Sequence, residues 1–144
     1  MYGQNRYSAN YSANQYRANS VNTSPLQLVV MCYDGMIRFM GKAKEAIETK
    51  NIADKVKYVN KTIAIVDELQ NSLDFTQGGE VARNLDRIYD YFNNELMKVS
   101  MKDDLEVLAH LLTLTRDLRS AWAEISNNNP TLGNNRDQGV TITG

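Results

Sequence analysis

His110 is the only histidine of the chain, and Glu106 precedes it by about one helical turn. Two such residues on one helix face are a possible start for a metal site. Di-iron helical bundles, however, use the pattern Glu-x-x-His twice, together with two further glutamates. This chain has Glu-x-x-x-His, and only once. We therefore interpret His110 as a surface side chain paired with a carboxylate.

Cys32 is the only cysteine and lies in an apolar run, which favours a buried, inert thiol over a nucleophile or a zinc ligand. The pair Gly78-Gly79 lacks the Gly-Lys-Ser/Thr ending of a phosphate-binding loop and is interpreted as a plain turn. The sequence contains no GxSxG, HExxH or CxxC motif. We predict no enzyme, no catalytic residue, no metal and no cofactor. The isolated aspartates are interpreted as solvated charges: Asp34, Asp86 and Asp90.

Length and charge point to one domain without a nucleic-acid or membrane partner. The 144 residues are 42% hydrophobic and carry a formal net charge of -1. No apolar run approaches the ~20 residues of a membrane span, so no membrane insertion is expected. A single cysteine fits a reducing compartment, and the first residues have no apolar stretch typical of a signal peptide. We expect a cytoplasmic protein of the cytosol.

Composition divides the chain into three parts. Residues 1–23 are rich in Tyr and Asn, repeat the motif Tyr-Ser-Ala-Asn and contain few aliphatic side chains, so we expect a flexible segment. Residues 127–144 are polar and are expected to form a disordered tail. Residues 24–126 are expected to form a helical domain, because their apolar residues recur at spacings of three and four.

Four helices are expected within the domain. Ser24, Pro25 and Gln27 predict a capping box at the start of the first helix, which runs to about Ile47. The other predicted elements are a helix from about Asp54 to Leu73, a turn over Asp74–Gly79, a helix carrying Ala82 to Val99, and a helix that follows a capping box of Asp103 and Glu106. No stretch alternates with period two. Short connections then predict an all-α, antiparallel four-helix bundle.

The predicted helices carry more apolar surface than one core-facing stripe requires. On the third helix, Val81, Ile88 and Tyr91 lie beside the main stripe. An exposed apolar patch is typical of a binding surface, and an amphipathic helix in a groove is a recurring mode of recognition. The alternative is an irregular bundle with a wide core, and periodicity alone leaves both open.

Three segments resemble the FliS family of flagellar export chaperones. Residues 16–47 have a tyrosine, Val-x-Thr, Ser-Pro at the helix start and then Tyr-Asp-Gly; residues 78–92 have Gly-Gly-Glu, Asn-Leu and Tyr-Asp-Tyr; residues 114–125 surround the single tryptophan. The segments occur in the family's order, and the resemblance covers about residues 16–126. Together they are specific, although each alone is a weak signal.

The resemblance implies a bundle that binds the disordered C-terminal segment of flagellin, prevents its premature polymerisation and supports its export by the flagellar type III system. It implies no nucleotide and no metal. The cytoplasmic domain of the flagellar export gate is a further partner to consider, and the chain is expected to be a monomer or a weak homodimer. The alternative function is a helical adaptor for another secreted or regulatory protein.

Candidate contact residues for the client lie on the matching motifs. A core role is the alternative for those on the main apolar stripes, whereas Ile88 and Tyr91 are expected at the surface. In the N-terminal segment, Tyr11 and Tyr16 are expected to fold over the client groove when it is empty, with plain disorder as the alternative. The client-contact candidates are Tyr33, Met36, Leu85, Ile88, Tyr89, Tyr91 and Phe92.

Overall fold

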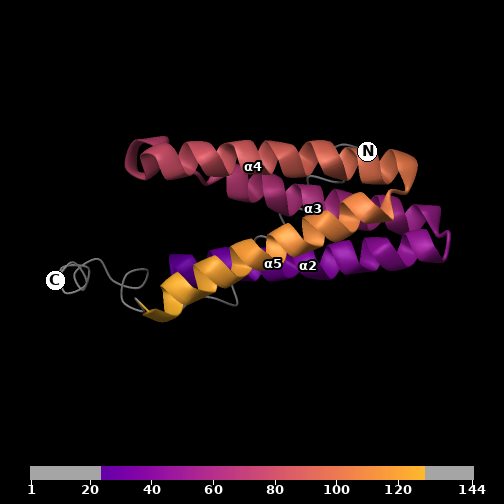
Figure 1. Ribbon diagram of the computed structural model, residues 1–144, viewed down its shortest axis with the longest axis horizontal. Helices are drawn as coiled ribbons and strands as arrows, with labels where there is room; N and C mark the ends of the chain where they lie inside the picture. The colour runs from indigo at the N-terminus through magenta and orange to yellow at the C-terminus, as the bar shows by residue number, and fades with distance from the viewer. Residues whose placement is uncertain (1–23, 129–144) are drawn as a thin grey trace.

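Four α-helices run in alternating directions through the described part of the chain (Figure 1). The computed structural model describes residues 24–128, and these contain no β-strand. The helices are α2 (Pro25–Glu48), α3 (Ile52–Asn71), α4 (Phe75–Lys102) and α5 (Leu105–Asn128). The prediction of an all-α four-helix bundle is confirmed. Residues 1–23 and 129–144 lie outside the described residues, and α5 continues slightly past the boundary predicted at residue 126.

Side chains that accept from free backbone amides fix where α2 and α3 begin. The Ser24 Oγ accepts from the Gln27 amide at 3.1 Å, and the Gln27 Oε1 accepts from the Ser24 amide at 3.2 Å. This confirms the predicted capping box, with Pro25 at the first helical position. Asn51 caps α3 by accepting from the Asp54 amide at 3.0 Å, so α3 begins earlier than predicted.

The predicted turn over Asp74–Gly79 is largely helical. The Asp74 carboxylate accepts from the amides of Thr76 and Gln77, both at 3.0 Å, and α4 begins at Phe75. Gly79 then interrupts the helix with φ +52°, a left-handed value that glycine adopts without steric cost. Gly79 therefore kinks α4 directly after its first turn, within the segment that was predicted as a turn.

The start of α5 is capped by the neighbour of the predicted residue. Asp103 ends α4 in the left-handed region, and its carboxylate accepts from Lys55 Nζ at 2.6 Å. Asp104 accepts from the Val107 amide at 3.1 Å. The predicted capping box of Asp103 and Glu106 is thus wrong by one position, because Asp103 is already used to close α4.

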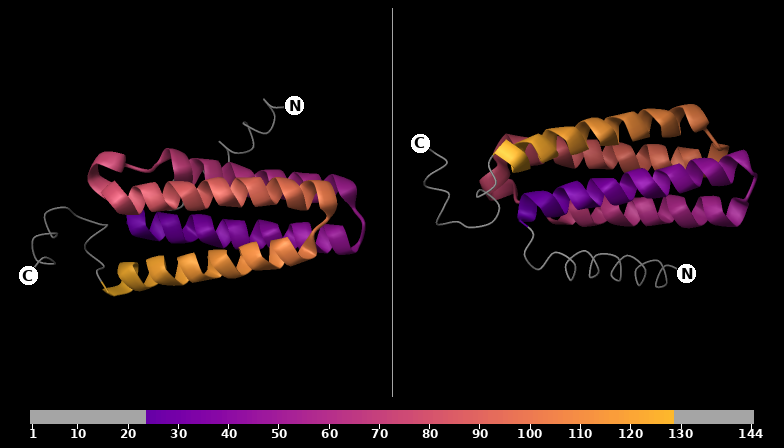
Figure 2. Two further views of the ribbon diagram at one scale, coloured as in Figure 1. Left: turned by 45° about the horizontal axis from the view of Figure 1, so that its top comes forward. Right: turned by 90° about the horizontal axis from the view of Figure 1, so that it is seen from below.

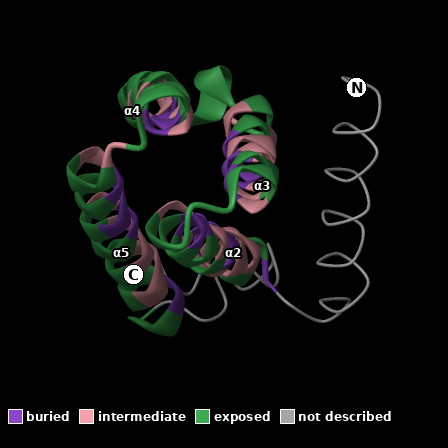
Figure 3. Cartoon of the chain, turned by 90° about the vertical axis from the view of Figure 1, so that its right-hand side faces the viewer, coloured by how far each residue is buried: buried purple, intermediate pink, exposed green. Residues whose placement is uncertain are grey.

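The four helices are packed unequally around the core. α2 packs closely against α3 and α5, α3 packs against α4, and α4 touches α5 only sparsely. Figures 1 and 2 show α5 diverging from α4 with distance from the turn that joins them. Buried residues line the inner faces of all four helices (Figure 3). The largest fully buried side chains include Tyr33, Met36, Met40, Val59, Val66, Tyr89, Phe92, Leu96, Leu108 and Leu111.

No helix within residues 24–128 combines the length and the hydropathy needed to cross a lipid bilayer.

Candidate protein-binding surface

Four of the seven predicted contact residues lie in the core. Tyr33, Met36 and Phe92 are fully buried, and Tyr89 is 2% exposed. Their place on the main apolar stripes accounts for this burial. These four side chains pack between the helices. Their direct contact with a client stays a prediction, and it requires the helices to separate.

The hydroxyls of Tyr33 and Tyr89 form a hydrogen bond of 2.7 Å inside the bundle. The Trp122 side chain of α5 lies near the Tyr33 hydroxyl and partly offsets the effect of burial on its pKa. Burial raises the pKa of both tyrosines above the ordinary value of 10.0, and both stay neutral. The apolar spacing predicts both residues inside, but nothing in it shows that their hydroxyls meet.

The other three candidates form a line along the outer side of α4. Val81, Leu85, Ile88 and Tyr91 follow one another at spacings of four, three and three, which places them on one helix face. Val81 is 61% exposed and Tyr91 is 40% exposed, whereas Leu85 and Ile88 are half-buried against the core. The predicted exposure of Tyr91 is confirmed, and Ile88 is accessible only in part.

A ring contact shows that this line is turned toward α5. The rings of Tyr91 and His110 meet edge to face, with their centroids 6.2 Å apart and an interplanar angle of 87°. One and two turns further along α5 lie Leu114 and Leu118, both half-buried. The outer line of α4 with these α5 residues is called the α4–α5 surface below.

His110 differs from its prediction in one respect. It is exposed, as expected, but within residues 24–128 it forms no ion pair with Glu106 or another carboxylate. Its imidazole instead packs against the edge-to-face partner Tyr91. The residue therefore belongs to the α4–α5 surface as an aromatic contact.

The three aspartates interpreted as solvated charges instead connect helices. Asp34 on α2 accepts a hydrogen bond from the Arg119 guanidinium on α5, and this contact raises the pKa of Arg119. Asp86 and Asp90 on α4 both accept from the Gln70 side chain on α3, at 2.9 and 2.8 Å. Such pairs depend on the register between helices, which a single sequence does not reveal.

A second exposed apolar group was not singled out from the sequence. Met97 and Met101 on α4 are 52% and 71% exposed, and Ile52 and Val56 on α3 are 70% and 41% exposed. The hydrogen bond between Lys55 and Asp103 joins the same ends of α3 and α4. The sequence signal that could have indicated this group is the spacing of the two methionines by one turn, beside the buried stripe.

The described residues offer little for catalysis. Cys32, the single cysteine, is half-buried, and residues 24–128 contain no group of three His, Cys, Asp or Glu side chains that could hold a metal ion. A helical bundle with exposed apolar side chains both on the α4–α5 surface and at the ends of α3 and α4 has the features typical of a protein-binding helical module.

Comparison with known proteins shows which family this chain belongs to. The family model described as "Flagellar protein FliS" matches residues 8–129. The flagellar secretion chaperone FliS of Campylobacter jejuni is 35% identical over 120 residues, which cover 83% of this chain and 94% of that relative. That of Bacillus subtilis is 32% identical over 84% of this chain and 86% of its own length, and that of Salmonella typhimurium is 31% identical over 74% and 79%. The chain belongs to the FliS family, a family of chaperones and not of enzymes.

Proposed function

We propose that this chain is a cytosolic export chaperone that binds the disordered C-terminal segment of flagellin, prevents its premature polymerisation and supports its export by the flagellar type III system. Membership of the FliS family supports the chaperone role. The observation that carries the binding mode is the line of exposed and half-buried apolar residues on the α4–α5 surface. Binding of an apolar helix face of the client at this surface removes apolar area of both proteins from water, which is favourable.

The energetics of this surface suit a client that must be released. Burying one large apolar side chain of the client contributes about 1.5–3 kcal/mol. Ordering the disordered segment opposes binding by about 2–5 kcal/mol or more. A few buried side chains therefore yield a favourable but moderate affinity. The sparse packing between α4 and α5 leaves α4 accessible along the side where the client would lie.

The N-terminal segment is assigned a covering role in this proposal. Tyr11 and Tyr16 lie outside the described residues, and their aromatic rings would occupy the α4–α5 surface while no client is bound. The flagellar export gate, through its cytoplasmic domain, is proposed as the partner that receives the loaded chaperone. Without client the chain is a monomer or a weak homodimer.

Calorimetry with the last ~40 residues of the cognate flagellin tests the proposal, because folding coupled to burial gives a large negative heat-capacity change. Binding with this signature supports the assignment. No heat and no change in the circular dichroism of the segment would reject flagellin as the client. A helical adaptor for another secreted or regulatory protein would then be the remaining function.

A further inference from the structure

Two aromatic rings and several cations meet on the outer face shared by α2 and α3. Phe39 of α2 and Tyr58 of α3 stack with ring centroids 5.9 Å apart. The Arg38 guanidinium lies 5.1 Å from the centre of the Phe39 ring, and Lys61 Nζ lies 5.6 Å from it. Lys57 Nζ lies 5.1 Å from the centre of the Tyr58 ring. Aromatic faces thus hold three cations close together.

The cations follow the helices in a regular pattern. Arg38 and Lys42 are one turn apart on α2, and Lys57 and Lys61 are one turn apart on the antiparallel α3. Within residues 24–128, Lys42, Lys57 and Lys61 form no ion pair. These four residues with Phe39 and Tyr58 are called the cationic face. Its positive charge stands against a formal net charge of -1 for the whole chain.

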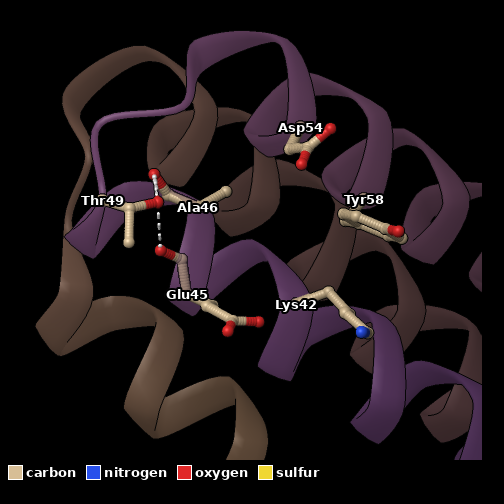
Figure 4. A pocket seen from close by; sticks show the side chains of 6 residues that line it. All are labelled: Lys42, Glu45, Ala46, Thr49, Asp54 and Tyr58. Carbon is tan, nitrogen blue, oxygen red and sulfur yellow. Dashed lines mark hydrogen bonds between the residues drawn. The ribbon is translucent and has the colours of Figure 1, made fainter.

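A pocket borders the cationic face at the turn between α2 and α3 (Figure 4). Its volume is about 280 Å³. Tyr58 and Lys42 line it from the side of the cationic face, and Glu45 and Asp54 line it from the other side. The surface therefore changes sign along its length, from four cations to two carboxylates. Such a gradient favours one orientation of a bound chain over the reverse.

We propose that the cationic face docks an acidic amphipathic helix of a second protein, separate from the flagellin client. Carboxylates spaced one turn apart on such a helix match the one-turn spacing of the cations on α2 and α3. An aliphatic side chain between them packs on the stacked rings of Phe39 and Tyr58. A basic residue of the same helix reaches the carboxylates of the pocket.

The chain's own ends do not supply this occupant. Residues 1–23 contain two arginines and no acidic residue, and residues 129–144 contain one arginine and one aspartate. A nucleic acid would also meet cations and rings here, but the carboxylates of Glu45 and Asp54 would repel its phosphates at the pocket. An acidic protein segment with one basic residue is complementary in charge both to the cations of the face and to the carboxylates of the pocket.

The cationic face is on the opposite side of the bundle from the α4–α5 surface. Figure 3 shows the pair α2 and α3 on one side of the core and the pair α4 and α5 on the other side. Both surfaces can therefore be occupied at once. This inference goes beyond the proposed function, and a chaperone holding its client would still present the cationic face to a second partner.

The test uses the full-length, ¹⁵N-labelled chain and a synthetic amphipathic peptide that carries glutamates at i, i+4 and i+7, a leucine at i+3 and a lysine at i+11, all on one helix face. We expect amide shifts to change at residues 38–42 and 57–61, and the affinity to fall with added salt. The same peptide with glutamine in place of glutamate is expected not to bind. Shifts confined to other helices, or equal binding of the glutamine peptide, would overturn the proposal.

The matched variants separate local charge from total charge. Lys57→Gln with Lys61→Gln removes two cations of the face, and Lys44→Gln with Lys102→Gln removes two exposed lysines elsewhere. We expect about tenfold weaker peptide binding for the first pair and less than about twofold for the second. Both pairs should bind the flagellin segment as the unchanged chain does. Equal effects of the two pairs, or tighter binding of single-stranded DNA than of the peptide, would reject the assignment.

Discussion

The hydroxyls of Tyr33 on α2 and Tyr89 on α4 share a 2.7 Å hydrogen bond across the core, although the residues are 56 positions apart. The two helices that carry them are not adjacent in the bundle, because each packs on α3 and their backbones do not approach one another. The bond therefore connects opposite sides of the bundle. It also satisfies two polar groups that water does not reach.

Removing either hydroxyl should destabilise the fold. Tyr33→Phe leaves the buried Tyr89 hydroxyl without its hydrogen-bond partner, and we expect a loss of about 1–3 kcal/mol. Tyr89→Phe leaves the Tyr33 hydroxyl without the same bond, and we expect a loss of the same order, about 1–3 kcal/mol. Urea unfolding followed by circular dichroism measures both. The double variant should lose less than the sum, and simple additivity would contradict a direct bond.

The same pair should make the fold sensitive to alkaline pH. Burial raises the pKa of both hydroxyls in the folded chain above the value of 10.0 that they have when unfolded. Above about pH 10 the unfolded chain therefore binds fewer protons than the folded one, and the free energy of unfolding falls as pH rises. Below that pH the pair adds no pH dependence. The double phenylalanine variant should show a shallower fall between pH 10 and 12, and an unchanged slope would assign the effect to other groups.

The helices and their inward faces could be predicted from the sequence because burial repeats every three or four residues. The spacing places Tyr89 and Phe92 inside and Tyr91 outside, as found. Helix ends are harder to predict, because Asp103 and Asp104 are both suitable N-caps in the sequence, and only the structure shows that Asp103 closes α4 while Asp104 caps α5.

Contacts between helices could not be predicted at all. The bonds of Gln70 to Asp86 and Asp90, and the stacking of Phe39 on Tyr58, depend on how far each helix is shifted along its neighbour. One sequence contains the periods of its helices but not their relative register.

Tyr91 should contribute to client binding more than to stability. It is 40% exposed and lies on the α4–α5 surface. We expect Tyr91→Ala to weaken binding of the flagellin segment about tenfold, roughly 1.4 kcal/mol, and to cost the fold less than about 1 kcal/mol. Met101→Ala is the control, because Met101 is 71% exposed on the same helix but at the other apolar group. Calorimetry compares the two, and a larger effect of Met101→Ala would move the client site to that end of α4.

Deleting residues 1–20 should tighten client binding if the N-terminal segment covers the α4–α5 surface. A cover that is closed in about nine molecules of ten weakens the apparent affinity roughly tenfold, and its removal restores that factor. Tyr11→Ser with Tyr16→Ser in the full chain should produce a similar gain, because the rings are proposed to make the contact. Calorimetry of both variants provides the measurement. Unchanged or weaker binding would rule out the covering role.

Two glycines on different helices should respond in opposite directions to alanine. Gly79 has φ +52° inside the kinked start of α4, so Gly79→Ala forces a side chain into the left-handed region and should cost about 1–2 kcal/mol. Gly41 is exposed within α2, and a Cβ there would meet no atom within 4 Å. Gly41→Ala should therefore stabilise the fold by about 0.5–1 kcal/mol, because alanine loses less backbone freedom on folding. Thermal unfolding of the two variants checks the signs, and stabilisation by Gly79→Ala would show that the start of α4 tolerates a regular helix.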